Sequence, residues 1–201
     1  MKLVCLDLEG VLVPEIWVEL AKKSGIDGLL KTTRDEPDYD VLMNYRIGLL
    51  EENGLTLSDV QEVIETMDPL PGAKEFLDRL REQAQVIIIS DTFEQFAQPL
   101  MKKLGWPTIF CNSLVIGEGG RITGYEMRCE PSKLKTVECL HECGIQTIAS
   151  GDSYNDVGMI QNSLAGFFFC TTDEIKAEYP DVPALSTYDE LYDNIMVALG
   201  E

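Results

Sequence analysis

Carboxylates follow three separate apolar runs of the sequence. The first run covers residues 1–6, and three acidic side chains come within the next nine residues. The polar residues that follow the three runs are, in chain order, Asp7, Glu9, Glu15, Ser90, Asp91, Gly151 and Asp152. A single aspartate after a strand is often only a helix N-cap, but three runs that end alike are hard to explain by capping.

The spacing of these residues points to metal-assisted phosphoryl chemistry. If the runs are parallel strands, their carboxyl ends meet at one edge of a sheet, where Asp7, Ser90, Asp91 and Asp152 converge. Such close carboxylates repel one another unless a cation holds them ionised, and Mg²⁺ prefers hard oxygen ligands of this kind. A carboxylate at a strand end can also act as a nucleophile and form an aspartyl-phosphate.

The transferring phosphoryl group would need a hydroxyl and a lysine to hold its charge. Ser90 supplies the hydroxyl. Lys133 opens the helical pattern that leads into the strand carrying Asp152, so it is well placed, but the spacing does not exclude Lys135.

The elements that position these residues alternate between strand and helix. Non-alternating apolar runs, typical of strands buried on both faces, are separated by helical patterns, several of which end at a glycine. The strand runs are KLVCLDL, QVIIISD, QTIASGD and AGFFFCT, and the helical patterns end at Gly105, Gly144 and Gly166. This alternation predicts an α/β fold with a parallel sheet.

Residues from about 14 to 67 interrupt the alternation, because they contain helical patterns and no strand pattern. Three signals within this block describe the expected helices: Pro14 at a helix entry, a helical apolar stripe in the second pattern and a capping box at the start of the third. The stripe consists of Val41, Leu42, Tyr45 and Leu49, and the capping box of Ser58 and Gln61. A second interruption, with Gly117, Gly119 and Gly120 between two strand patterns, predicts a β-hairpin.

Charge and cysteine content exclude several functions. The 201 residues include 16 Lys and Arg and 35 Asp and Glu, which gives a net charge of −19. A nucleic acid would be repelled, and an anionic substrate would need a local cation. The six cysteines form no CxxC motif. Cys139 and Cys143 lie near His141, the one histidine of the sequence, and a zinc site there would need ligands from elsewhere. We therefore expect reduced thiols rather than a zinc site.

Localisation follows from the same composition. No apolar stretch reaches the ~18 residues that a membrane span needs, and the first residues do not resemble a signal peptide. We therefore expect a cytoplasmic protein with no membrane partner.

Four ordered motifs resemble those of the haloacid dehalogenase-like hydrolase superfamily. They are DLEGV from Asp7, SDT from Ser90, a lysine, and GDSYND from Gly151. The segments DLEGVLVPEIW, TTRDEPDYDVLM, SDTF and GDSYND are further similar to the phosphoserine phosphatase branch, and within it to enzymes that also transfer the phosphoryl group from phosphoserine to homoserine. The similarity runs over nearly the whole chain.

The resemblance implies a fold and an activity. The fold would be a three-layer, Rossmann-like core (residues 1–13 and 72–201) with a small helical cap (14–71) inserted after the first strand. The activity would be Mg²⁺-dependent hydrolysis of phosphoserine, with transfer to homoserine, in serine and threonine biosynthesis. A homodimer is a further expectation.

The resemblance also implies roles for individual residues. Asp7 would be the nucleophile and a metal ligand, Glu9 would give its carbonyl to the metal and act as general acid and base, and Asp152 would complete the metal site. Phosphate and substrate contacts would come from Ser90, Asp91, Lys133 and Asn155, and Asp156 would orient the water around the metal. In the cap, Arg46 would bind the substrate carboxylate and Glu15 its ammonium group.

One departure affects the expected activity. Most phosphatases of this superfamily carry aspartate two residues after the nucleophile, where this chain has Glu9. The longer side chain agrees with the phosphotransferase relatives and leaves the balance between hydrolysis and transfer open. Two alternatives also stay open: a phosphatase of another small phosphate ester, and a non-enzymatic receiver-like module that is phosphorylated on aspartate.

Overall fold

The computed structural model describes residues 1–32, 35–36 and 38–200. Thr33, Arg34 and Pro37, which belong to the TTRDEPDYDVLM segment, lie outside the described residues, as does Glu201. In the described part of the chain, no helix combines the length and the apolar character needed to cross a membrane.

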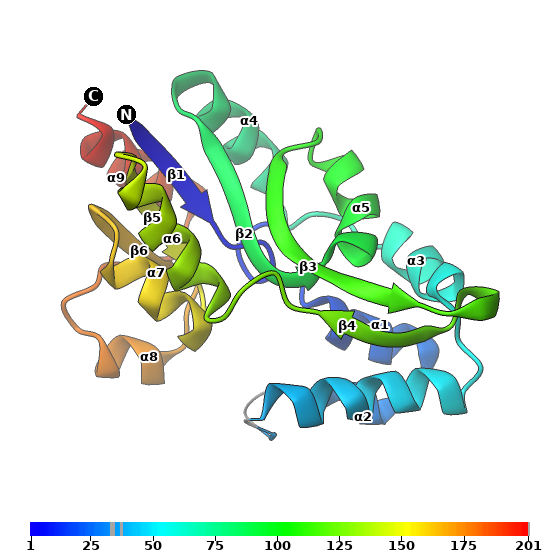
Figure 1. The fold of residues 1–201 in the computed structure, drawn as a ribbon. Coiled ribbons are helices and arrows are strands. Elements are labelled where there is room, and N and C mark those ends of the chain that lie inside the picture. The colour runs from blue at the N-terminus through cyan, green and yellow to red at the C-terminus, as the bar shows by residue number, and fades with distance from the viewer. Residues whose placement is uncertain (33–34, 37, 201) are drawn as a thin grey trace.

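A sheet of seven strands occupies the centre of the described chain, in the order β4-β3-β2-β1-β5-β6-β7 (Figure 1). The strands are β1 (Lys2–Leu6), β2 (Val86–Phe93), β3 (Thr108–Ile116), β4 (Ile122–Glu126), β5 (Gln146–Gly151), β6 (Ala165–Phe169) and β7 (Ala184–Leu185). Neighbouring strands are parallel except β3 and β4, which form the expected antiparallel hairpin.

Helices connect the strands and cover both faces of the sheet. The α-helices are α1 (Ile16–Ser24), α2 (Tyr39–Glu52), α3 (Leu57–Glu65), α4 (Ala73–Gln83), α5 (Glu94–Lys103), α6 (Ser132–Glu142), α7 (Val157–Gln161), α8 (Asp173–Glu178) and α9 (Tyr188–Leu199). Short 3₁₀ turns are η1 (Asp27–Leu30), η2 (Glu118–Gly120) and η3 (Tyr154–Asp156).

The apolar runs form strands because both of their faces are buried. In β1, Val4 and Leu6 join the core beneath α4, α5 and α9, whereas Leu3 and Cys5 join a second core beneath α6, α7 and α8. This arrangement of helix, sheet and helix confirms the predicted three-layer α/β fold.

The described residues between 14 and 71 form helices only. Trp17 and Leu20 of α1, Met43 of α2 and Ile64 of α3 belong to the same buried cluster as one face of the sheet. Helix α3 contacts α5, and α2 lies alongside β4 (Figure 1). The block therefore packs against the hairpin side of the sheet and shares its hydrophobic core.

The predicted capping box was assigned to the wrong pair. Thr56, not Ser58, caps α3: Thr56 accepts from the backbone N–H of Asp59, and Asp59 accepts from that of Thr56. Ser58 and Gln61 have the same spacing but lie inside the helix, where Gln61 donates to the carbonyl of Gln95 at 2.8 Å. The pattern alone cannot separate two overlapping candidates.

The predicted apolar stripe of α2 was also partly wrong. Val41 and Tyr45 are 50% and 42% exposed, and Leu49 is half-buried. The residues that α2 buries are Leu42, Met43, Arg46, Ile47 and Leu50. Because Arg46 belongs to the buried face, a stripe predicted from apolar residues alone is rotated around the helix axis relative to the face that α2 buries.

Two helix ends differ from their expected positions. Helix α1 begins at Ile16, with Glu15 as N-cap, so Pro14 precedes the helix and does not open it. Helix α7 ends at Gln161, and Gly166 lies in β6 instead of closing the helix. A Cβ at Gly166 would lie 2.5 Å from the carbonyl oxygen of Ile160, so close packing explains that glycine.

Candidate active site

Asp7 stands directly after β1, at the carboxyl edge of the sheet. Its backbone N–H donates to the carbonyl of Ser150 on β5 at 2.9 Å, which fixes the residue between two strands. Its Oδ1 accepts from the backbone N–H of Leu8 at 2.7 Å and lies 2.9 Å from Nζ of Lys133. The side chain is almost fully buried, so the carboxylate is held in one orientation.

Lys133 joins Asp7 to Asp156. Its Nζ lies 2.6 Å from Oδ1 of Asp156, and both side chains are inaccessible to solvent, with 2% and 0% exposed. Lys135, the rival lysine, is exposed and pairs with Glu138 at the surface. The two lysines lie on different sides of α6, and only Lys133 faces the sheet edge.

Asp156 is fixed by the loop that follows β5. Its Oδ2 accepts from the backbone N–H groups of Asp152 and Ser153, each at 3.0 Å. A Cβ at Gly151 would lie 2.1 Å from Cγ of Asp156, so only glycine lets the aspartate approach the strand end. Gly10, with φ of +76°, also lies close to Asp152: a Cβ there would be 2.5 Å from its Cγ.

The sequence had suggested that Ser90 and Asp91 lie at the end of β2. They lie instead on a bulge within this strand. Between Ile89 and Phe93 the register with β3 shifts, so the residues between them leave the ladder. The Oγ of Ser90 accepts from the N–H of Thr92 at 3.2 Å. Bulges re-aim side chains, and here the carboxylate of Asp91 reaches Asn155 of η3.

Three donors hold Asp91. Its carbonyl accepts from Nδ2 of Asn112 on β3 at 3.0 Å and from the hydroxyl of Tyr39 on α2 at 3.4 Å. Its Oδ2 accepts from Nδ2 of Asn155 at 2.8 Å. Asp91 thereby connects β2, β3, α2 and η3.

Glu9 and Glu15 occupy the loop that leads from β1 into α1. Oε2 of Glu9 accepts from the backbone N–H of Ile16 at 2.8 Å. Burial and the nearby charge of Glu15 raise the pKa of Glu9 to about 8. Glu15 itself is exposed.

Arg46 is buried on the helical side of the site. Its guanidinium lies 4.7 Å from the ring centroid of Trp17 and donates from Nη2 to the carbonyl of Lys31 at 2.8 Å. Its Nε is buried and has no hydrogen-bond partner among the described residues. Burial lowers the pKa of Arg46, while the charges of Glu9 and Glu15 counteract that loss.

The carboxylates at the sheet edge carry the electrostatic mark of a cation site. Oxygen atoms of Asp7, Asp152 and Asp156 lie within 4.8 Å of one another. Burial and the charge of Asp156 raise the pKa of Asp7 well above its usual range, although Lys133 opposes the shift, and the same two causes raise the pKa of Asp152 to about 7. Burial alone would lower the pKa of Lys133, but the charges of Asp156 and Asp7 raise it well above its usual value. One lysine does not neutralise three acids, so the donor set suits a divalent cation with oxygen ligands.

Comparison with known proteins agrees with this geometry. Residues 1–163 match the haloacid dehalogenase-like hydrolase family. The chain belongs to the haloacid dehalogenase-like hydrolases. Phosphoserine phosphatase ThrH of Pseudomonas aeruginosa is 51% identical to this hydrolase over 95% of the chain and 93% of the relative. A phosphoserine phosphatase of Pseudomonas syringae pv. tomato is 50% identical over 95% of the chain and 81% of the relative. A solved structure described as a substrate-bound phosphoserine phosphatase complex has a TM-score of 0.76 at 23% identity, covers 93% of each chain and shows the same fold.

Two residues near the site of this hydrolase were not predicted from the sequence. Tyr39, the first residue of α2, places its hydroxyl against Asp91, and the charges of Asp91, Arg46 and Glu9 all act on its phenol. Asn112 is 1% exposed and ties β3 to the bulge. Asn112 could have been noticed as a polar residue within a mostly apolar strand pattern. No local feature of the sequence distinguishes Tyr39.

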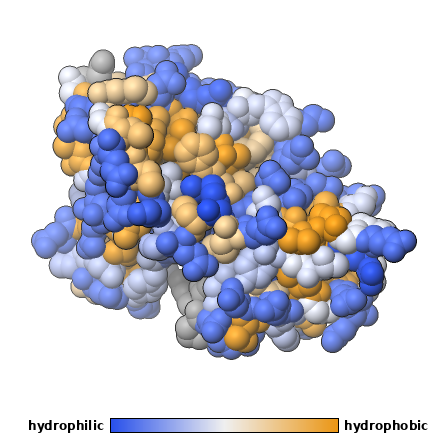
Figure 2. Space-filling view, in the orientation of Figure 1, coloured by the Kyte–Doolittle hydropathy of each residue, from blue (hydrophilic) through white to orange (hydrophobic). Residues whose placement is uncertain are grey.

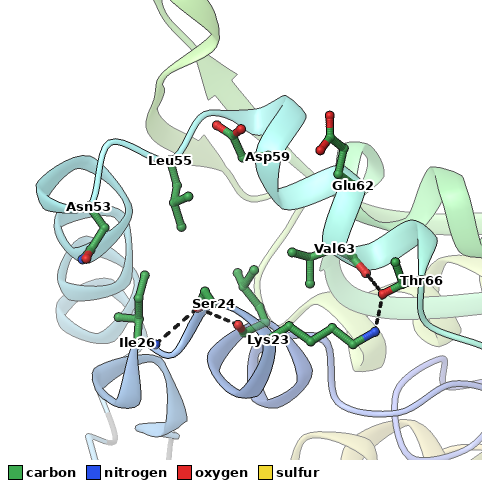
Figure 3. Close-up of a pocket in the computed structure, with 10 residues that line it drawn as sticks. Lys23, Ser24, Ile26, Asn53, Leu55, Asp59, Glu62, Val63 and Thr66 are labelled. Atoms are coloured by element: carbon green, nitrogen blue, oxygen red, sulfur yellow. Dashed lines mark hydrogen bonds between the residues drawn. The ribbon is translucent and has the colours of Figure 1, made fainter.

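A separate hollow lies within the helical block of the hydrolase (Figure 3). It has a volume of about 560 Å³ and is formed by α1, α3 and the loop before α3. Figure 3 shows Ile26, Leu55 and Val63 pointing into it, while the carboxylate of Glu62 points away. Its charged side chains are exposed, so it lacks the buried ionic groups that distinguish the sheet edge.

Proposed function

We propose that this hydrolase is a Mg²⁺-dependent phosphoserine phosphatase that works through an aspartyl-phosphate and also transfers the phosphoryl group to homoserine. One observation carries the proposal. A buried cluster of Asp7, Lys133, Asp152 and Asp156 lies at the strand ends of a chain that is half identical to phosphoserine phosphatases over 95% of its length. We also propose that these activities serve serine and threonine biosynthesis.

We assign residues 1–13 and 72–201 to a catalytic core and residues 14–71 to a cap. The contact of Tyr39 with Asp91 and the buried position of Arg46 support a cap that closes over the sheet edge. Closure limits the entry of water and brings substrate-binding groups from α1 and α2 to the core.

Asp7, Asp152 and the carbonyl of Glu9 would hold Mg²⁺, with Asp156 orienting the surrounding water. The cluster fits this assignment because both carboxylate oxygens of Asp156 already have partners: Oδ1 contacts Lys133, and Oδ2 accepts from two backbone N–H groups. This suits a supporting role next to the metal. Bound Mg²⁺ supplies positive charge that lets the acids ionise together and offsets the charge of the phosphoryl group.

Asp7 would attack the phosphorus of phosphoserine, and the bond from phosphorus to the serine oxygen would break. Ser90 and Lys133 would hold the phosphoryl oxygens. Glu9 would give its proton to the departing serine oxygen, and its raised pKa, about 8, supports a role as general acid.

In the second half-reaction, ionised Glu9 would take a proton from water or from the hydroxyl of homoserine. The oxygen so activated would attack the phosphorus and release Asp7. Arg46 would bind the amino-acid carboxylate and Asn155 would contact the substrate. Glu15 is the expected partner of the ammonium group. We also propose a cytoplasmic location for the protein.

The test is an assay of a panel of phosphate esters with Mg²⁺, with and without homoserine. We expect phosphoserine to be the preferred ester, and added homoserine to divert product from inorganic phosphate into homoserine phosphate. Glu9→Asp should shift that ratio, because a shorter side chain moves the base by about one methylene. Hydrolysis of phosphoserine without any homoserine phosphate would leave a phosphatase only, and a preference for another ester would reject the substrate.

A further inference from the structure

The carboxylate of Asp91 is fixed in place but only half used. Donors from Asn112 and Tyr39 hold its backbone, and Asn155 binds Oδ2. Its Oδ1 is buried and has no hydrogen-bond partner among the described residues. A desolvated carboxylate oxygen without a donor is costly, so its fixed orientation suits a donor that a ligand brings.

A second buried side-chain atom without a partner among the described residues is Nε of Arg46. The described residues contain three such side-chain atoms: Oδ1 of Asp91, Nε of Arg46 and Oγ of Ser150. Both groups are linked to Tyr39: its hydroxyl donates to the carbonyl of Asp91, and the charge of Arg46 acts on its phenol. One offers an acceptor and the other a donor, which complements the ammonium and carboxylate groups of an amino acid.

The charge of Asp91 also argues against a role in holding phosphate. Asp91 lies close enough to Lys133 to act on its charge, so the carboxylate weakens the attraction of that region for an anion. A protonated amine would gain from the same charge. Glu15, the expected ammonium partner, is exposed, and the attraction of an exposed carboxylate is weakened by solvent.

We propose that Oδ1 of Asp91 accepts a hydrogen bond from the ammonium group of the amino-acid substrate and is the main determinant of selectivity for amino-acid phosphates. The inference rests on the proposed function and names the atom that recognises the substrate ammonium group. Asn155 and Asn112 then act as positioning residues that aim the carboxylate.

The test compares two substrates that differ only in the amine. Phosphoserine carries it, and 3-(phosphonooxy)propanoate keeps the phosphate ester and the carboxylate without it. Asp91→Asn should lower kcat/KM for phosphoserine by about 10- to 100-fold, the size of one hydrogen bond to a charged group, and lower that for the analogue much less. Glu15→Gln is the matched control and should reduce the preference for phosphoserine less than Asp91→Asn does.

Asp91→Glu and Asp91→Ala guard against a folding defect. Asp91→Glu keeps the charge and should retain part of the preference, whereas Asp91→Ala should lose it while still hydrolysing the analogue. If Asp91→Asn slows both substrates equally, or if Glu15→Gln alone removes the preference, the inference is wrong. If the wild-type protein hydrolyses neither substrate, the proposed function fails instead.

Discussion

At the scale of single residues, the orientation of Asp7 is set before any substrate binds. The N–H of Leu8 and the ammonium of Lys133 both contact Oδ1, and burial removes competing water. As the proposed nucleophile, Asp7 held in this way avoids much of the entropy cost of reaching the phosphorus.

Asp7→Asn should therefore abolish turnover, with a loss of phosphate release of about 1,000-fold or more, because an amide is a poor nucleophile and a weaker ligand for a hard cation. Addition of EDTA to the wild-type protein should have a similar effect. Asp181→Asn, at an exposed aspartate, is the control and should keep full activity. Turnover that survives either Asp7→Asn or EDTA would reject the mechanism.

A substitution at Gly10 tests how closely the loop after Asp7 must approach Asp152. Gly10→Ala introduces a Cβ 2.5 Å from Cγ of Asp152 at a residue with φ of +76°, whereas Gly25→Ala, at φ of +72°, meets nothing within 4 Å. Both variants should lose about 1–2 kcal/mol in urea unfolding, because both force alanine into the left-handed region. Only Gly10→Ala should also lose activity and Mg²⁺ affinity. Equal activity in the two variants would mean that the close approach does not matter.

At the scale of elements, the start of α2 connects the helical block to the hairpin. The hydroxyl of Tyr39 reaches the carbonyl of Asp91, and the hydroxyl of Tyr125 on β4 donates to Asp40. The two tyrosine rings meet edge to face with centroids 5.8 Å apart. Arg46 lies two turns further along the same helix, so these contacts help to set its position.

The double variant Tyr39→Phe with Tyr125→Phe should loosen this connection while keeping the rings. We expect KM for phosphoserine to rise by about 3- to 10-fold with a smaller change in kcat, because part of the free energy of the two lost hydrogen bonds is lost from substrate binding. Tyr45→Phe, on the exposed side of α2, is the control. An equal rise in KM for Tyr45→Phe would show that the effect comes from the helix in general.

The capping box of α9 gives a pH-dependent contribution to stability. Glu190 accepts from the backbone N–H groups of Ser186 and Thr187, and these bonds lower its pKa. Because the folded pKa lies below the unfolded one, the contribution is complete above the ordinary value of about 4.3 and disappears as pH falls through the folded value.

Glu190→Gln should therefore lower Tm at neutral pH, and the difference from wild type should shrink at an acidic pH below the folded pKa, where the wild-type carboxyl is protonated as well. Asp193→Asn, an exposed position on the same helix, should change Tm little at either pH. Thermal unfolding followed by circular dichroism measures both. A difference that is equal at both pH values would contradict an ionised cap.

At the scale of the whole molecule, a charge of −19 surrounds a site proposed to bind an anionic substrate. Figure 2 shows hydrophilic residues around the rim of one face, with apolar patches between them. Lys133 is buried beneath the site and pairs with acids, so the surface potential repels an approaching phosphate ester.

Added salt should therefore help the reaction. Raising KCl from about 10 mM to about 150 mM, which shortens the screening length from ~30 Å to ~8 Å, should increase kcat/KM for phosphoserine a few-fold at fixed Mg²⁺. The KM for homoserine, which has no net charge at neutral pH, should change less. A steep fall of kcat/KM with salt would show that local cations steer the substrate.

Local chemistry in the sequence determined the sheet and its functional edge. Apolar runs that do not alternate are typical of strands buried on both faces, and each such strand places its last residue at the sheet edge, so the convergence of Asp7 and Asp152 could be predicted. The position of Ser90 and Asp91 was only approximately predictable, because the register shift in β2 depends on how that strand pairs with β3.

Tertiary structure alone decided which member of each ambiguous set is used. Lys133 and Lys135 lie about 200° apart around α6, and only packing against the sheet determines which of them is buried. The buried face of α2 includes Arg46, which an apolar pattern cannot anticipate. The contact of Tyr39 with Asp91 joins residues 52 positions apart, and such a contact depends on how α2 packs against the sheet rather than on any local preference of the chain.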